Sequence, residues 1–100
     1  MSESNKRFLN FGSLNRDMVY SVDHTVRPGE TTASSKLEFF CGGKGLNQSI
    51  ALSRAGEKVY HAGCVGTDGK SLLNKLKENS VDISLVKEST SVSGHAIIQV

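Results

Sequence analysis

The sequence predicts an α/β fold built on a parallel sheet with flanking helices. Two stretches with helical spacing of apolar residues, at 46–55 and 72–76, lie between short apolar runs at 8–12, 58–65 and 81–86. A helix between successive strands connects them by crossovers, which give a parallel sheet. With 100 residues, the chain forms one domain at most, or a piece of a larger one.

Composition argues against several classes of protein. Apolar residues make up 37% of the chain, which is enough for a folded core. The 12 basic and 10 acidic residues include no basic run, so the sequence argues against nucleic-acid binding. The apolar stretches are too short to cross a membrane, and the polar residues 1–7, which we expect to be frayed, provide no secretory signal. We therefore expect a cytoplasmic protein without a membrane partner.

The cysteines and histidines do not suggest a metal site. Cys41 and Cys64 form no CxxC pair, and the three histidines are scattered along the chain. We expect both thiols to be reduced and to be buried as small side chains.

An antiparallel hairpin is predicted over residues 18–41. Residues 18–22 have strand composition, and Pro28 with Gly29 predicts a turn. The segment 31–41 alternates with period two, which is typical of a half-exposed strand. In its second half, Leu37, Phe39 and Cys41 alternate with Lys36, Glu38 and Phe40.

Three glycines in four positions, at 42–45, mark the start of the first helix, which ends at Gly56. The stretch does not match a phosphate-binding P-loop, and Gln48 replaces the third glycine of a dinucleotide site. Missing Cβ atoms would let a ligand approach the backbone, with Lys44 and Asn47 in the opening turn. A tight strand-to-helix turn would need only one glycine, so the stretch favours a binding loop.

Asn15 and Asp17 follow the first strand and form a second candidate site. Ligands of parallel α/β sheets lie beyond the carboxyl ends of the strands. Residues two apart in an extended segment point to the same side, so the amide and the carboxylate would face one ligand. Together they can donate to and accept from neighbouring hydroxyls, as a polyol requires. Asn and Asp are also common turn residues, so this interpretation depends on the glycine stretch nearby.

The last third of the chain adds a helix and two strands. Gly66 closes the strand at 58–65, and Thr-Asp-Gly at 67–69 offers a helix start. After the polar stretch 87–93, residues 94–100 are strand-like, and the sequence stops inside them. Because a domain rarely ends within an apolar strand, we expect an N-terminal portion of a longer sequence.

These motifs together resemble the N-terminal signature of the ribokinase-like carbohydrate kinases of the phosphofructokinase-B type. The similar segments are Gly-Gly-Lys-Gly-Leu-Asn-Gln-Ser at 42–49, Gly-Ser-Leu-Asn-Arg-Asp at 12–17, Arg-Pro-Gly-Glu-Thr at 27–31 and Val-Gly-Thr-Asp-Gly at 65–69. The glycine motif is closer to the ribokinase branch than to fructokinases or adenosine kinases. The resemblance covers nearly all of residues 8–100. It implies a sheet flanked by helices and a small β-sheet lid, to which residues 18–41 and 94–100 contribute strands.

The resemblance also implies a site for a pentose. By similarity, Asn15 and Asp17 hydrogen-bond the sugar hydroxyls. The remaining sugar-site residues that it implies are Gly43, Lys44 and Asn47 in the cradle, and Ala96 and Ile98 on the lid.

The implied reaction is transfer of the ATP γ-phosphoryl group to a primary sugar hydroxyl, with Mg²⁺-ATP and K⁺ as cofactors of the complete protein. The family's catalytic base lies in a Gly-Ala-Gly-Asp segment, which is absent from this sequence. The resemblance also implies that the sequence is truncated before a nucleotide-binding half. We therefore expect no catalytic residue and no kinase activity in this chain alone. A non-catalytic sugar-binding or regulatory module and a nucleoside kinase of the same fold are the alternatives. Family members often dimerise through the lid, so we expect the complete protein to be a homodimer.

Overall fold

The computed structural model describes residues 6–100, which form two three-stranded sheets and two helices. The first sheet is parallel throughout, as the alternation of strands and helices predicted. Its strand order is β1 (Arg7–Phe11), β4 (Lys58–Val65) and β5 (Asp82–Glu88). This α/β architecture confirms the predicted fold class.

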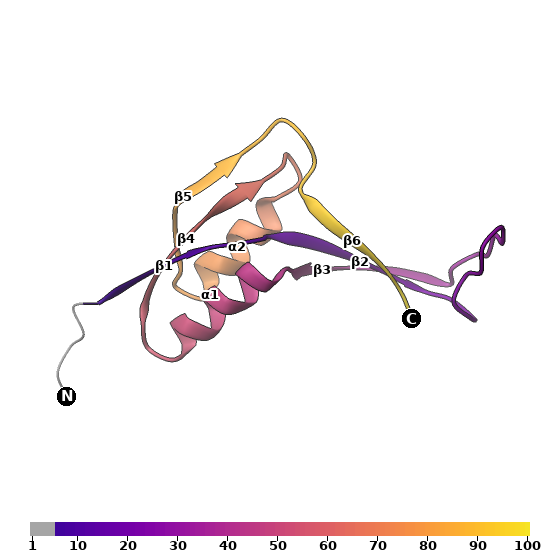
Figure 1. The fold of residues 1–100 in the computed structure, drawn as a ribbon, viewed down its shortest axis with the longest axis horizontal. Coiled ribbons are helices and arrows are strands. Elements are labelled where there is room, and N and C mark those ends of the chain that lie inside the picture. The colour runs from indigo at the N-terminus through magenta and orange to yellow at the C-terminus, as the bar shows by residue number, and fades with distance from the viewer. Residues whose placement is uncertain (1–5) are drawn as a thin grey trace.

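The second sheet extends away from the helices along the long axis of the molecule (Figure 1). Its strand order is β3 (Lys36–Gly42), β2 (Asn15–Ser21) and β6 (Gly94–Gln99). The β2–β3 pair is antiparallel, as the hairpin prediction required, whereas β6 joins β2 in parallel. The chain therefore leaves the first sheet after β1, builds the hairpin, and returns to this second sheet with its last strand.

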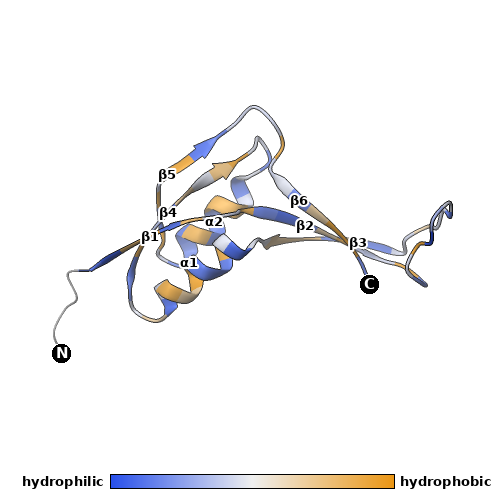
Figure 2. Cartoon of the chain, in the orientation of Figure 1, coloured by the Kyte–Doolittle hydropathy of each residue, from blue (hydrophilic) through white to orange (hydrophobic). Residues whose placement is uncertain are grey.

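One face of the first sheet is covered by the helices α1 (Lys44–Arg54) and α2 (Lys70–Glu78). Both helices carry hydrophobic residues beside hydrophilic ones (Figure 2), as expected of helices with one buried face. Leu72 and Leu76 of α2 are each 0% exposed. The buried apolar core consists of Leu14, Leu46, Ile50, Val59, Val65, Leu72, Leu76 and Val81.

Within residues 6–100, nothing covers the opposite face of the first sheet, which is largely apolar. Phe11 pairs with Ala62, which in turn pairs with Leu85, so these side chains share one face. Phe11 is 82% exposed and Leu85 is 50% exposed. Cys64 lies on this face and is exposed, so the prediction that both cysteines are buried is wrong for Cys64. Cys41 is half-buried and packs against the core.

Several predicted boundaries were wrong. Strand β2 begins at Asn15, three residues before the predicted start, and β3 begins at Lys36 instead of residue 31. Residues 1–7 were expected to be frayed, but Arg7 pairs with Lys58 in the sheet. The other part of that prediction, residues 1–5, lies outside the described residues.

Asp68 connects the two sheets. Its carboxylate accepts a hydrogen bond from Arg16 of β2 at 3.0 Å and another from the Ser93 amide, just before β6, at 2.7 Å. The Ser93 hydroxyl accepts from the Gly66 amide at 2.8 Å, which extends the connection to the end of β4. Hydrogen bonds from Ser93, and then from Arg16, lower the pKa of Asp68 from 3.8 to about 2.

The substitution Asp68→Asn is expected to destabilise the chain in a pH-dependent way. Because the folded-state pKa lies below the ordinary value, the stabilisation is present at neutral pH and is lost as the pH falls from about 4 towards 2. Thermal unfolding followed by circular dichroism should show a lower midpoint for the variant near neutral pH. The difference from wild type should shrink as acid is added. A difference that stays constant with pH, or an equal effect of Asp23→Asn at an exposed carboxylate, would contradict this assignment.

Candidate functional site

Two chain segments meet where the sheets join. The first runs from Gly12 into β2, and the second runs from the end of β3 into α1. The amide of Leu46 donates to the carbonyl oxygen of Ser13 at 3.0 Å, and the amide of Asn47 donates to that of Gly43 at 3.1 Å. The Leu46–Ser13 hydrogen bond holds the first turn of α1 against the turn that precedes β2.

The glycines at this junction allow the two backbones to touch. A Cβ at position 45 would overlap the carbonyl carbon of Gly12 and lie 2.5 Å from the Ser13 amide nitrogen. Gly43 has a φ of 102°, and a Cβ there would lie 2.7 Å from the Ser13 carbonyl oxygen. At these two glycines the chain itself fills the space of the missing Cβ atom, which gives a packing reason for glycine there. Contact of this backbone with a ligand stays a prediction.

Asn15 and Asp17 lie on the same face of β2, near its start. A Cβ on Gly42, in the neighbouring strand, would overlap the Asp17 carboxylate. The absence of a side chain at this glycine therefore leaves space for the carboxylate. On the other side, a Cβ on Gly94 would lie 2.5 Å from Asn15 Oδ1. The expectation that both side chains point the same way is met, although the segment belongs to a strand and is not a loop.

The polar groups of this face are available to a ligand. Within residues 6–100, neither the Asn15 amide nor the Asp17 carboxylate takes part in a side-chain hydrogen bond or an ion pair. Lys44 and Asn47, both exposed in the first turn of α1, likewise have no side-chain partner in the described part of the chain. An amide, a carboxylate and an ammonium group can together donate to and accept from several hydroxyls.

Apolar side chains adjoin these polar groups. Ala96 pairs with Asp17, and Ile98 pairs with Val19, so the strand register puts both on the face of Asn15 and Asp17. Both are half-buried.

The sequence analysis missed one further residue of this face, Phe40. It pairs with Asp17 across the hairpin and is 50% exposed. The sequence contained a signal for this residue. In the alternating pattern of its strand, Phe40 occupies a position on the same face as the polar residues Lys36 and Glu38. An exposed aromatic ring beside a carboxylate offers an apolar surface to the carbon face of a ligand.

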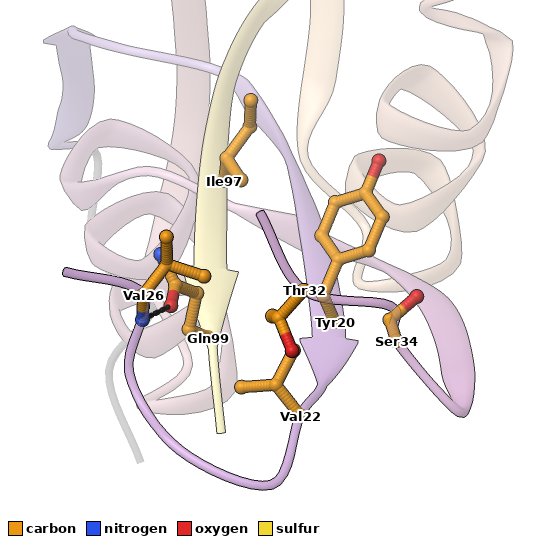
Figure 3. Close-up of a pocket in the computed structure, with 7 residues that line it drawn as sticks. All are labelled: Tyr20, Val22, Val26, Thr32, Ser34, Ile97 and Gln99. Carbon is orange, nitrogen blue, oxygen red and sulfur yellow. Dashed lines mark hydrogen bonds between the residues drawn. The ribbon is translucent and has the colours of Figure 1, made fainter. Parts of the chain in front are cut away.

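The other face of the second sheet carries a separate hollow of about 300 Å³ (Figure 3). Tyr20 and Gln99 pair across β2 and β6 and line the hollow together with Ile97. The Gln99 side-chain carbonyl accepts a hydrogen bond from the Val26 amide at 2.8 Å. Since residues alternate along a strand, this hollow and Asp17 lie on opposite faces of the sheet.

Two features of residues 6–100 bear on a site for Mg²⁺-ATP. No group of three or more His, Cys, Asp or Glu side chains converges anywhere in residues 6–100. At Gly43 and Gly45, the space of the missing Cβ atoms is filled by the segment 12–15. None of the helices in the described part of the chain has the length and apolar character needed to span a bilayer.

A parallel sheet with a small second sheet, and with unpaired polar side chains where they join, defines an α/β domain with a polar site at the edge of the sheet. Comparison with known proteins makes the class specific. The chain belongs to the pfkB family of carbohydrate kinases, whose family pattern matches residues 5–100.

Similar proteins support the same assignment. The ribokinase of Haemophilus influenzae is 38% identical over 92 residues, covering 89% of this chain and 30% of that protein. The crystal structure of ribokinase from Cryptococcus neoformans in complex with ADP has a TM-score of 0.87 and 40% identity, covering 95% of this chain and 30% of that one. The structure of Arabidopsis thaliana ribokinase with ribose and ATP has a TM-score of 0.80 and 26% identity, covering 93% of this chain and 31% of that one.

The chain therefore spans about 30% of the length of the relatives that it matches. The two sheets and two helices described above correspond to this part of those folds.

Proposed function

We propose that these residues are the N-terminal, sugar-binding portion of an ATP-dependent kinase that converts D-ribose and ATP to ribose 5-phosphate and ADP. The observation that carries the proposal is the face shared by Asn15 and Asp17, whose polar groups have no partner in residues 6–100. The ribokinases among the similar proteins, including one solved with ribose and ATP, favour ribose as the sugar.

In this proposal the chain binds and orients the sugar. The Asp17 carboxylate accepts hydrogen bonds from two neighbouring hydroxyls, and the Asn15 amide donates to one of them and accepts from another. The start of α1 completes the cradle with Lys44, Asn47 and the backbone at Gly43. Phe40, Ala96 and Ile98 give an apolar surface to the ring carbons, and the second sheet acts as a lid.

The remainder of the chemistry is assigned to the rest of the whole polypeptide that carries these residues, which we call the full-length protein. Mg²⁺-ATP supplies the phosphoryl group, and K⁺ is proposed as a second ion there. The uncovered apolar face around Phe11 and Leu85 supports this division, because a further layer of structure would bury it.

We also propose that the full-length protein forms a homodimer through the face of the lid opposite Asp17. Leu37, Phe39 and Ile97 share that face and are 41%, 52% and 65% exposed. The hollow in Figure 3 lies on the same face and would receive side chains of the partner. A cytoplasmic location remains a prediction from the sequence.

The 100-residue chain is expected to show no ATP-dependent phosphorylation of ribose, whereas the full-length protein is expected to show it. The reason is that the sequence lacks the Gly-Ala-Gly-Asp segment in which the family resemblance puts the catalytic base. A coupled assay for ADP, run with equal molar amounts of both proteins, makes the comparison.

The sugar is varied in the same assay. Ribose turnover well above nucleoside turnover supports the proposal, and a preference for nucleosides would assign the protein to the nucleoside kinases. Binding of ribose without turnover by the full-length protein would indicate a non-catalytic module.

A further inference from the structure

Asn10, Ser49 and His61 form a hydrogen-bond chain buried between the first sheet and α1. Ser49 and His61 are both 0% exposed. Asn10 Nδ2 donates to the Gly45 carbonyl oxygen at 2.9 Å and to Ser49 Oγ at 3.0 Å. Ser49 Oγ lies 2.6 Å from His61 Nδ1, and His61 Nε2 lies 3.0 Å from the Gly12 carbonyl oxygen. These hydrogen bonds form a continuous series from the backbone of α1 to the turn that follows β1.

The partners determine where the protons lie. A carbonyl oxygen only accepts, so His61 Nε2 carries the proton of a neutral ring, and Nδ1 accepts from the Ser49 hydroxyl. The Ser49 oxygen in turn accepts from Asn10, so every donor has one acceptor. Burial lowers the pKa of His61, against the opposing effect of its hydrogen bond to Gly12, and this favours the same neutral form.

Both ends of this series of hydrogen bonds lie on the segments that carry the proposed sugar contacts. The Gly12 carbonyl precedes Ser13, whose own carbonyl oxygen accepts from the first turn of α1. Gly45 is the second residue of α1, two positions before Asn47. Gly12 and Gly45 touch through bare backbone, with no side chain to lock one against the other. The buried hydrogen bonds therefore act together with the Leu46–Ser13 backbone hydrogen bond to resist sliding along this contact.

We propose that Asn10, Ser49 and His61 are positioning residues that hold the Asn15–Asp17 strand and the head of α1 at the spacing that a sugar requires. None of the three lies on the face that would touch the sugar. The inference rests on the proposed function. A shift of about 1 Å between the two segments would weaken several hydroxyl contacts at once.

The test compares His61→Leu with His61→Gln in the full-length protein. Leucine fills the site with an apolar side chain and removes both nitrogens, whereas glutamine restores an amide able to donate to the Gly12 carbonyl. His61→Leu is expected to raise the KM for ribose about tenfold, with the KM for ATP unchanged. His61→Gln should recover most of the ribose affinity.

Ser49→Ala gives a second measurement that stands if His61→Leu fails to fold, and it should raise the KM for ribose about threefold. Ser53→Ala is the matched control, because Ser53 lies one turn further along α1 and donates to the Asn79 carbonyl, away from Gly12. It should lower the thermal midpoint without moving the KM for ribose.

A KM for ribose that is unchanged in the folded variants, with kcat falling only as the folded fraction falls, would overturn the positioning role. A wild-type protein that phosphorylates no sugar would overturn the proposed function itself.

Discussion

Replacement of Asp17 by asparagine is expected to lower kcat/KM for ribose by about 100-fold or more in the full-length protein. A carboxylate that accepts from two hydroxyls makes two charge-assisted hydrogen bonds, and each contributes about 1.5–3 kcal/mol. Within residues 6–100 the Asp17 carboxylate makes no hydrogen bond, so the substitution should break no hydrogen bond of the described fold. The loss should therefore fall on sugar binding and leave stability unchanged.

Steady-state kinetics with varied ribose, at saturating ATP, measure the effect, and thermal unfolding of the same samples measures stability. Asp23→Asn is the matched control, because it removes the same charge from an exposed position in the hairpin loop. A change of less than about threefold for Asp17→Asn, or an equal change for Asp23→Asn, would contradict the assignment of Asp17 to the sugar site.

Replacement of Gly45 by alanine is expected to cost about 3 kcal/mol of folding free energy. The added Cβ would overlap the Gly12 carbonyl carbon, which is backbone and has no alternative rotamer. Relief would require α1 to move away from the turn before β2. That movement would also stretch the hydrogen bond from Asn10 to the Gly45 carbonyl. Because domains of this size are stable by only about 5–15 kcal/mol, a loss of this size would be large.

Urea unfolding of the wild type and the variant gives the two free energies of unfolding. The control is Gly29→Asn in the hairpin loop. That position has a φ of 77° and open space around the missing Cβ, and asparagine tolerates this backbone conformation. It should change stability by less than about 1 kcal/mol. If Gly45→Ala also stayed within that range, the close backbone contact would not matter for stability.

The sequence predicted the parallel sheet and the hairpin because apolar periodicity reports directly on which faces are buried. Leu72 and Leu76, spaced for one helix face, are both 0% exposed. The alternation between residues 36 and 41 predicted the existence of β3, although its start was predicted at residue 31. The start of β2 was missed, since Asn15 and Asp17 are residue types that favour turns, and their pairing depends on distant strands.

The remaining features depend on contacts between segments far apart in the chain. Nothing in the local sequence links Arg16 to Asp68, or His61 to Gly12. Likewise, the packing of Gly45 against Gly12 was missed because Gly12 lies 33 positions earlier in the printed sequence. The exposure of Cys64 was missed for the same reason, because only the arrangement of the helices shows which face of β4 stays uncovered.

A crystal structure of the full-length protein with ribose tests the central claim most directly. We predict that the sugar hydroxyls lie within hydrogen-bonding distance of the Asp17 carboxylate and the Asn15 amide, with Asn47 at the other side of the ring. Ribose bound elsewhere, with the Asp17 carboxylate facing solvent or paired to another protein group, would contradict it.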